Sequence, residues 1–524
     1  MKKIILTTSC IFVCIIIQAQ TLFDVTKFGA KGDDRTINTV AIQRAIDECS
    51  ANGGGNVFIP NGTFITGTVH LKNNVTLYLN EGAVLKGEGD MKAFSSAGNN
   101  RGAMIYAFQQ DNIAISGKGK INGNGNHPAF QSEEKYDGLP NRPYTILLQE
   151  CTNVRLKEFT LKNGTFWCIK LLQCNNVTVD DISVISRVVA NNDGLDITDC
   201  FNTRVANCFF DCGDDAICPK SESPVGVKKL VITNCILTSE SNGIKFGTAS
   251  TGGFEDVAIS NCHIYDTRLA GIALELVDGG VFDRIVINNI TMHNVNGGLF
   301  IKLGHRRGNT PGILRNVMVS NLIADGIGLW QPDTTAFYFK PPKGSPKIGM
   351  CIAGQPGYLV ENVTLQNIYM QFAGGGTQAD AERIMEDMPQ SYPEYNNFGI
   401  TPAYAYNCRH VKNLRLNNLR FEFLKEDVRP ALFFEDIEGL DISGFHADIS
   451  GEASGFIRCK DIKDLFVHNC KPQQVNIPFF LFEGKMDDVT IMNNDFRKVK
   501  KIYSFRNIVS EKEFEVKNNL FHSP

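Results

Sequence analysis

The chain has 524 residues, of which 43% are hydrophobic and 21% charged, and its formal net charge is -4 at pH 7. These proportions are ordinary for a globular protein, and without a basic stripe or a nucleic-acid motif they give no reason to expect nucleic-acid binding. Length alone suggests about three domains, but internal repeats take precedence over that estimate.

The first twenty residues have the pattern of a secretory signal. A charged start and an apolar stretch over 4–17 lead to a cleavage point before Thr21. Cys10 or Cys14 could instead carry a lipid anchor, but both lie inside the apolar stretch. The stretch is too short to span a bilayer comfortably, and no other run is long enough. We therefore expect residues 1–20 to direct export to the periplasm or the cell exterior.

A short helix is expected near the start of the remaining chain. The segment 38–49 has helical spacing, and three glycines at 53–55 end it before a strand at 57–60. Exposed strand edges aggregate, so we expect this helix to cap the open end of the domain. Its apolar face would carry Ala41, Ile42, Ala45 and Ile46.

One pattern recurs along most of the chain: an apolar residue, any residue, asparagine, and then an apolar residue or cysteine. Its regular period is about 23–28 residues, the size of one coil of a parallel β-solenoid, whereas a propeller blade needs about 40 or more. We therefore predict an all-β fold, a right-handed parallel β-helix that forms a single domain over 21–524. The copies begin at Val205, Ile232, Ile259, Ile287, Val319, Leu365, Leu416, Val467 and Ile491.

The asparagine and the cysteine of this pattern have separate expected roles. The asparagine should lie at the bend between strands, where it tolerates turn backbone and can hydrogen bond along the stack. Cys208, Cys235 and Cys262 recur one repeat apart. Export permits disulfides, but this spacing favours stacked, buried free cysteines. No Cys/His set has zinc spacing, and we expect no metal.

Two long loops, about 323–360 and 371–410, interrupt the period. Long loops on a repeat scaffold often serve binding, although their aromatic residues could equally bury the loops against the solenoid. Those aromatic residues are Trp330, Phe337, Tyr338, Phe339, Tyr392, Tyr395 and Phe398.

Two segments one repeat apart, 191–197 and 213–218, place four aspartates at the start of neighbouring strands. Aspartate and glycine also favour turns, but two such segments in register indicate a carboxylate cluster on the outside of the solenoid. Hydrolysis of a glycosidic bond needs one acid to protonate the leaving oxygen and one base to activate water. The four aspartates are Asp193, Asp196, Asp214 and Asp215.

These motifs resemble a known family. The segment 24–33 resembles the opening motif of pectin-active β-helix enzymes, and 41–46 and 53–57 continue the resemblance. The aspartate segments resemble the Asn-Thr-Asp-Gly-x-Asp and Gly-Asp-Asp motifs of glycoside hydrolase family 28, the polygalacturonase family. The resemblance covers residues 22–320 best. It implies an inverting enzyme without a metal or other cofactor, built on a right-handed β-helix.

The resemblance also implies roles for the aspartates. Asp214 corresponds to the general acid, Asp193 and Asp215 to the carboxylates that activate water, and Asp196 to a nearby cleft carboxylate. Because crowded carboxylates cannot all ionise freely, one pKa should rise, as a general acid near neutral pH requires. Inversion needs carboxyl groups about 6.5–9.5 Å apart to admit water.

The chain departs from the family pattern twice. Asn242 stands where the family usually has the histidine of Gly-His-Gly. In the next coil the family has Arg-Ile-Lys, which holds a galacturonate carboxylate. The aligned stretch here is 271–275, so both basic residues are absent and Glu275 ends it.

Lysines could replace the missing basic pair. Strand alternation points Lys245 and Lys302 outward into the cleft, and Lys220 follows the second aspartate segment. Three lysines in one column suit an acidic sugar, although a solvated lysine needs no such role. Glu275 could pair with Lys245 or Lys302, which would favour a neutral sugar. The predicted substrate-binding residues are Asp196, Lys220, Asn242, Lys245, Glu275 and Lys302.

We therefore predict an exported, monomeric, polygalacturonase-type glycoside hydrolase that acts on pectic polysaccharide or oligosaccharide. The altered residues and long loops favour exo action on branched or rhamnogalacturonan-type pectin. A β-helix polysaccharide lyase is one alternative, with Lys245 or Lys302 as base and the aspartates on calcium. A non-catalytic carbohydrate-binding protein is another, because the family histidine is missing.

Overall fold

The computed structural model describes residues 22–95, 101–132, 141–331 and 340–521. The expected signal at 1–20 lies outside these residues, as do Phe337, Tyr338 and Phe339 of the first long loop. In the described part, no helix combines the length and the apolar character that crossing a bilayer requires.

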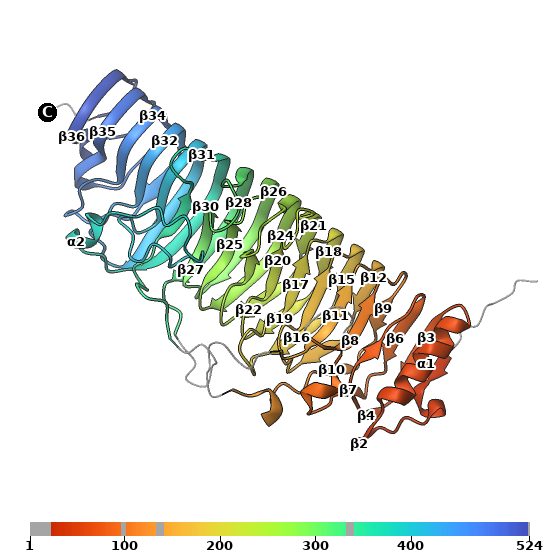
Figure 1. Ribbon diagram of the computed structural model, residues 1–524. Coiled ribbons are helices and arrows are strands. Elements are labelled where there is room, and N and C mark those ends of the chain that lie inside the picture. The colour runs from red at the N-terminus through yellow and green to blue at the C-terminus, as the bar shows by residue number, and fades with distance from the viewer. Residues whose placement is uncertain (1–21, 96–100, 133–140, 332–339, 522–524) are drawn as a thin grey trace, which may run out of the picture.

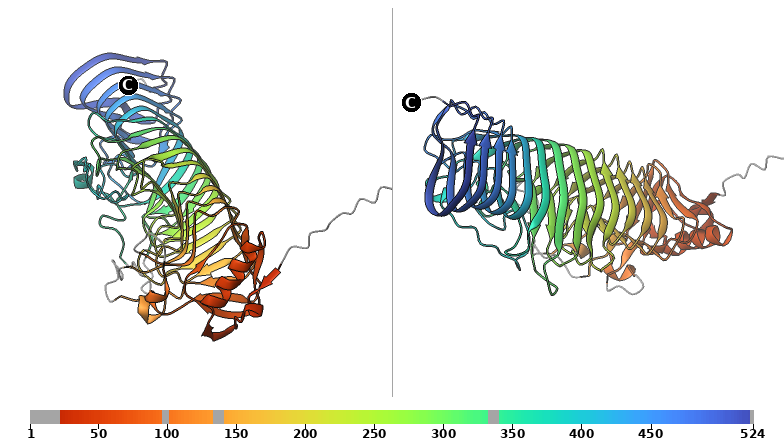
Figure 2. Two further views of the ribbon diagram at one scale, coloured as in Figure 1. Left: turned by 45° about the vertical axis from the view of Figure 1, so that its right-hand side comes forward. Right: turned by 90° about the horizontal axis from the view of Figure 1, so that it is seen from above.

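Short strands wind into a long right-handed parallel β-helix, which Figures 1 and 2 show as a stack of coils running from the N-terminal to the C-terminal end. The first coils contain β1 (Leu22–Asp24), β2 (Asp33–Ile37), β3 (Gly55–Ile59), β4 (Gly62–Thr66), β5 (Val69–His70), β6 (Val75–Leu79), β7 (Ala83–Gly87), β8 (Ala103–Phe108), β9 (Ala114–Ser116) and β10 (Lys120–Asn122). Three 3-10 turns accompany them: η1 (Val25–Phe28), η2 (Met91–Ala93) and η3 (Pro128–Phe130).

The middle coils carry three strands each, which pair in parallel with the strands of the coils before and after. They comprise β11 (Tyr144–Gln149), β12 (Thr152–Lys157), β13 (Thr160–Lys162), β14 (Ile169–Leu172), β15 (Asn175–Asp180), β16 (Ser183–Ser186), β17 (Leu195–Thr198), β18 (Phe201–Ala206), β19 (Phe209–Cys212), β20 (Ile217–Lys220), β21 (Val227–Thr233), β22 (Ile236–Ser239) and β23 (Ile244–Phe246).

In later coils the strands on either side of a bend merge into longer ones. Shorter strands remain between the merged ones, and the later coils together contain β24 (Gly253–Thr267), β25 (Ala270–Leu276), β26 (Val281–His293), β27 (Gly297–Leu303), β28 (Ile313–Ile327), β29 (Met350–Ala353), β30 (Val360–Gly374), β31 (Tyr406–Lys425), β32 (Leu432–Ser443), β33 (His446–Ala447), β34 (Ile457–His468), β35 (Val475–Met492) and β36 (Val499–Lys517).

The core is one continuous apolar column inside the coils, because alternate side chains of every strand point inward. Val179, Val205, Ile232, Ile259 and Ile287 occupy matching register positions in successive coils, and all are buried. Each such side chain contributes about 1.5–3 kcal/mol by leaving water. The repeat thus stabilises the fold only when the coils are stacked.

The repeated asparagines lie at the bends, as predicted. Asn234, Asn261, Asn289 and Asn321 have left-handed backbone with φ between 54° and 56°, which asparagine tolerates better than most residues. The Nδ2 of Asn289 donates to Oδ1 of Asn261 at 3.2 Å, and Asn321 donates to Asn289 at 3.3 Å. The prediction for the cysteines is also confirmed: Cys208, Cys235 and Cys262 are buried and free.

The predicted helix is α1 (Thr39–Ala51), at the N-terminal end of the stack (Figure 1). Its buried face carries Ile42, Ala45, Ile46 and Cys49, while Ala41 is half-buried. The helix packs against η1 and the first strands, and so covers this end of the core.

Both long insertions begin later than predicted. The strand β28 continues to residue 327 and β30 to residue 374, so the insertions cover 328–349 and 375–405. The strands continue because side chains beyond the bend still point into the core. In β28, Ala324 and Ile327 are both buried. In addition, β29 is a regular strand between the insertions. The second insertion contains the short helix α2 (Gln378–Ala381).

The aromatic residues of the insertions divide between the two expected roles. Trp330, Tyr395 and Phe398 are buried, and the last two pack with Leu269 and Phe300 of the solenoid. Tyr392 is 58% exposed. Among the described rings, those of Tyr395 and Phe398 therefore attach the second insertion to the solenoid, whereas the ring of Tyr392 stays exposed.

Candidate active site

A cavity of about 430 Å³ lies on the outer face of the middle coils, within the usual range for small-molecule sites. It lies between the turns that precede β17, β20 and β23 on one side and the second insertion on the other. Its lining residues are Trp167, Asn191, Asp193, Asp214, Asp215, Lys220, Ser241, Lys245, Gly247, Thr248, Arg268, Leu269, Tyr392, Glu394 and Asn396.

The parallel register stacks the two aspartate segments directly on each other. Leu195 of β17 pairs with Ile217 of β20, and the backbone N–H of Gly194 donates to the carbonyl of Asp215 at 2.9 Å. A Cβ at Gly194 would lie 2.4 Å from the carbonyl oxygen of Ala216. Only glycine therefore allows this close approach of the two turns.

Buried polar side chains hold the first aspartate segment in place. The Nδ2 of Asn192 donates to the carbonyl of Phe166 at 2.8 Å, and its Oδ1 accepts from Oγ of Ser186 at 2.7 Å. Arg142, also buried, donates to the carbonyl of Ala190 at 2.6 Å and to Oδ1 of Asn191 at 3.1 Å. The turn before Asp193 is thus fixed from within the protein.

Lys220 is the central cation among the aspartates. Its Nζ donates to Asp193 Oδ2 at 3.2 Å, to Asp196, and to the sulfur of Cys218 at 2.9 Å. Burial opposes its charge, but Asp196, Cys218 and Asp193 outweigh burial and raise the pKa of Lys220 well above its usual range. Asp193, Asp215 and Cys218 are grouped closely enough to hold a metal ion, yet this ammonium already contacts two of them.

Asp215 is held as an ionised carboxylate. Its Oδ1 accepts from Ser241 Oγ at 2.7 Å and from Asn242 Nδ2 at 2.8 Å, and its Oδ2 lies 3.7 Å from Lys245 Nζ. Burial raises its pKa, but the charges of Lys245 and Lys220 and these hydrogen bonds outweigh burial and lower the pKa of Asp215 below its usual range.

Asp214, the adjacent residue, is shifted the other way. It is half-buried, and its Oδ1 accepts from the backbone N–H of Asp215 at 2.9 Å. Burial and the charge of Asp215 raise the pKa of Asp214 to about 6. Burial and Asp196 also raise the pKa of Asp193 well above its usual range. Adjacent acids with opposite shifts are the arrangement that acid–base chemistry needs.

Four of the predicted substrate-binding residues do not line the cavity. Asp196 is fully buried and bonds Lys220. Asn242 lies behind Asp215, and its Oδ1 accepts from the backbone N–H of Ala270 at 2.9 Å. Glu275 is fully buried, and its carboxyl oxygens have no hydrogen-bond partner among the described residues. It thus forms no ion pair with Lys245 or Lys302, contrary to that expectation.

Lys302 is the fourth of these residues. It is buried under the second insertion, where it donates to the carbonyl of Met388 at 3.1 Å, to Ser391 and to Asn397. The predicted single column of lysines is wrong, because Lys245 is in register with Ala273 whereas Lys302 is in register with Glu275, two residues further on. Strand alternation predicts that the Lys302 side chain points outward, but it does not predict that the second insertion covers this side chain.

The insertion also supplies cavity residues that the sequence did not reveal. Glu394 forms an ion pair with Lys245 and accepts from Asn242 Nδ2 at 3.3 Å, across 149 and 152 residues of chain. The Lys245 ammonium lies 5.1 Å from the ring centroid of Tyr392. In the sequence, Tyr392 stands out only as one of several loop aromatics. No repeat or spacing marked Glu394.

Trp167 and Arg268 were also missed. The ring of Trp167 stacks on Phe166 with centroids 5.1 Å apart and lies 4.4 Å from the Lys220 ammonium. Arg268 lines the cavity, and its Nε donates to the carbonyl of Lys340 at 3.0 Å. Each lies in a turn without a repeated motif. A tryptophan in a polar cavity offers a flat apolar face, and a guanidinium suits carboxylates.

Comparison with known proteins agrees with this fold. The family model for glycosyl hydrolases family 28 matches residues 49–355, and the chain belongs to this family. A probable polygalacturonase of Vitis vinifera is 28% identical over 296 residues, covering 51% of this chain and 59% of the relative. An exopolygalacturonase of Zea mays is 30% identical over 246 residues, covering 45% and 56%. The chain thus matches less than two thirds of these relatives' length.

Among solved structures, the hyperthermoactive exopolygalacturonase of Thermotoga maritima has a TM-score of 0.61. The alignment covers 77% of this chain and 92% of that one, at 21% sequence identity. At this identity the comparison supports the shared β-helix fold.

Proposed function

We propose that this protein hydrolyses glycosidic bonds in pectin, with Asp214 as general acid and Asp215 as general base. One observation carries the proposal: two adjacent aspartates line the same cavity, with the pKa of Asp214 raised to about 6 and that of Asp215 lowered. Curated relatives named polygalacturonase and exopolygalacturonase support pectin as the substrate.

The chemistry follows from the two protonation states. Asp214 keeps its proton up to about pH 6 and gives it to the glycosidic oxygen as the bond breaks. Asp215 takes a proton from the water that attacks the anomeric carbon, which inverts that carbon. Asp193 would hydrogen bond to the same water. The ring of Trp167 would stack on the sugar.

The charges in the cavity favour a neutral sugar beside Lys245. Its ammonium faces Asp215 at 3.7 Å and the carboxylate of Glu394, so little positive charge is left for a uronate. Lys220 is likewise neutralised by Asp193 and Asp196. Arg268 would receive the acidic sugar. A site with one neutral and one acidic position suits rhamnogalacturonan-type or branched pectin.

The second insertion supports exo action. Tyr392, Glu394 and Asn396 form one wall of the cavity, and Lys302 and the buried ring of Phe398 hold that insertion against the solenoid. A wall at this place would stop the polymer from passing through, so a chain end would be cut. The proposal also includes export by the signal at 1–20, one β-helix domain over 21–524, and a monomer.

The test is product analysis on a panel of linear and branched pectic oligosaccharides, with wild type and Asp214→Asn. We expect saturated sugars from chain ends, lost in the variant. Products that carry an unsaturated uronate, visible by ultraviolet absorbance, would establish a lyase instead. Binding without turnover across the panel would establish a carbohydrate-binding protein.

The substitution Glu394→Gln tests the proposal that a neutral sugar binds beside Lys245. This change keeps the hydrogen-bond acceptor but leaves Lys245 with one carboxylate fewer. We expect kcat/KM for uronate-terminated relative to neutral-terminated oligosaccharides to rise about tenfold, the equivalent of about 1.4 kcal/mol. The matched control is Glu382→Gln, because Glu382 lies on the same insertion but pairs with Arg506. An unchanged ratio in Glu394→Gln would contradict the assignment.

A further inference from the structure

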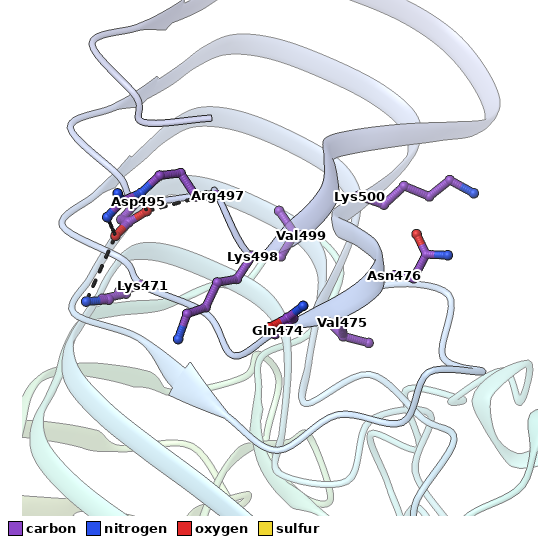
Figure 3. A pocket seen from close by; sticks show the side chains of 9 residues that line it. All are labelled: Lys471, Gln474, Val475, Asn476, Asp495, Arg497, Lys498, Val499 and Lys500. Carbon is purple, nitrogen blue, oxygen red and sulfur yellow. Dashed lines mark hydrogen bonds and ion pairs between the residues drawn. The ribbon is translucent and has the colours of Figure 1, made fainter. Parts of the chain in front are cut away.

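A second hollow lies far from this cavity, in the last coils of the solenoid. It is an open groove of about 660 Å³ at the turns that lead into β35 and β36. Figure 3 shows Lys498 between Lys471 on one side and Lys500 on the other, with the amides Gln474 and Asn476 nearby. The lining residues are Lys471, Gln474, Val475, Asn476, Asp495, Arg497, Lys498, Val499 and Lys500.

The groove carries a marked excess of positive charge, although the whole chain has a net charge of -4. Four of its lining residues are cationic and one is a carboxylate. The carboxylate of Asp495 forms an ion pair with the guanidinium of Arg497 at 2.8 Å, and the Lys471 ammonium lies 4.0 Å from the same carboxylate. Lys498 and Lys500 are exposed. A negative ligand would therefore find at least two further ammonium groups beside the Arg497–Asp495 pair.

The groove and the active site share one edge of the solenoid. Asp214 and Asp215 precede β20, and the groove residues 471–476 include the turn into β35. The register links these strands in one ladder through β23, β25, β27, β29, β31, β32 and β34. Eight strand spacings of about 4.8 Å separate them, roughly 40 Å along the axis. The second insertion covers β25, β27 and β29 of this ladder, so a polymer held in the groove would reach the cavity only by passing its free end over the insertion.

We propose that this groove binds a second stretch of an acidic polysaccharide, outside the active site. Ammonium groups bind carboxylates as point charges without a fixed geometry, which suits a repeating uronate chain. The amides of Gln474 and Asn476 can bond sugar hydroxyls. The groove would raise the local concentration of polymer near the cavity. The choice of a pectic polymer rests on the proposed function.

Binding of polygalacturonate is measured in the Asp214→Asn background, where the polymer is not consumed. To this we add Lys471→Gln, Lys498→Gln and Lys500→Gln together. We expect about tenfold weaker binding and a smaller dependence on salt, because exposed charges are screened. The matched control is Lys31→Gln, Lys118→Gln and Lys120→Gln, three exposed lysines in the N-terminal coils with the same change in charge. The control should bind within twofold of its parent.

In the otherwise wild-type chain, the groove variant should raise KM for the polymer and leave kcat/KM for short oligosaccharides unchanged. Equal binding by the groove and control variants would overturn the proposal. Binding of single-stranded DNA as tight as that of polygalacturonate would also overturn it, because the groove would then be a general anion site. Polymer binding that depends on the groove lysines, without hydrolysis by wild type, would uphold this proposal and refute only the proposed function.

Discussion

At the scale of residues, the site depends on how differently two neighbouring aspartates are treated. Asp215 accepts three side-chain hydrogen bonds and faces Lys245, whereas Asp214 accepts from the backbone N–H of Asp215 and lies beside the charge of that residue. Burial acts to raise the pKa of both residues. In Asp215 the lysine charges and hydrogen bonds outweigh burial, whereas in Asp214 they do not. The sequence indicated which aspartates cluster, but the direction of each shift needed the positions of Lys245 and Ser241.

This difference predicts the pH profile. Because Asp214 must be protonated to act as the acid, kcat/KM should fall about tenfold per pH unit above about pH 6. The lowered pKa of Asp215 keeps the base ionised through mildly acidic pH, so the loss at low pH should come only below the usual range for aspartate. Steady-state kinetics from pH 3 to 9 measure this, with thermal melts at each pH as control. A flat profile from pH 6 to 8 would contradict the assignment.

At the scale of elements, the site depends on the close stacking of successive turns. The turns before β17 and β20 approach so closely that a methyl group at position 194 meets a carbonyl oxygen at 2.4 Å and the sulfur of Cys212 at 2.7 Å. The Asn-Asp-Gly pattern showed that turns occur here. Their distance follows from the register of parallel strands, which the motif alone does not state.

Gly194→Ala should therefore harm both stability and catalysis. We expect a loss of about 1–3 kcal/mol in the free energy of unfolding, as for overpacked positions, and a lower kcat because the turn carrying Asp193 must move. Chemical denaturation and steady-state kinetics measure the two effects. The control is Gly451→Ala, where an added methyl group meets nothing within 4 Å, and where we expect less than about 0.5 kcal/mol. Equal effects of both changes would argue against tight stacking at the site.

At the scale of the whole molecule, the sequence predicted what is local and repeated. Each coil contacts only its neighbours, so a pattern of one coil's length revealed the β-helix, the asparagine bends and the buried cysteines. The second insertion breaks that rule. It pairs Glu394 with Lys245, 149 residues away in the chain, and it covers Lys302. A repeat pattern cannot predict such long-range contacts. The family motifs located the aspartates, while the wall opposite them came only from the structure.

The most direct test of the central claim is the activity of Asp214→Asn toward two leaving groups. We predict that kcat/KM falls by about 10²–10⁴ on the natural linkage, whose leaving oxygen needs a proton. It should change little on an activated aryl glycoside of the same sugar, whose leaving group departs without one. Asp215→Asn should lose activity on both. An equal loss for Asp214→Asn on the two substrates, or no loss on either, would contradict the role of Asp214 as the acid.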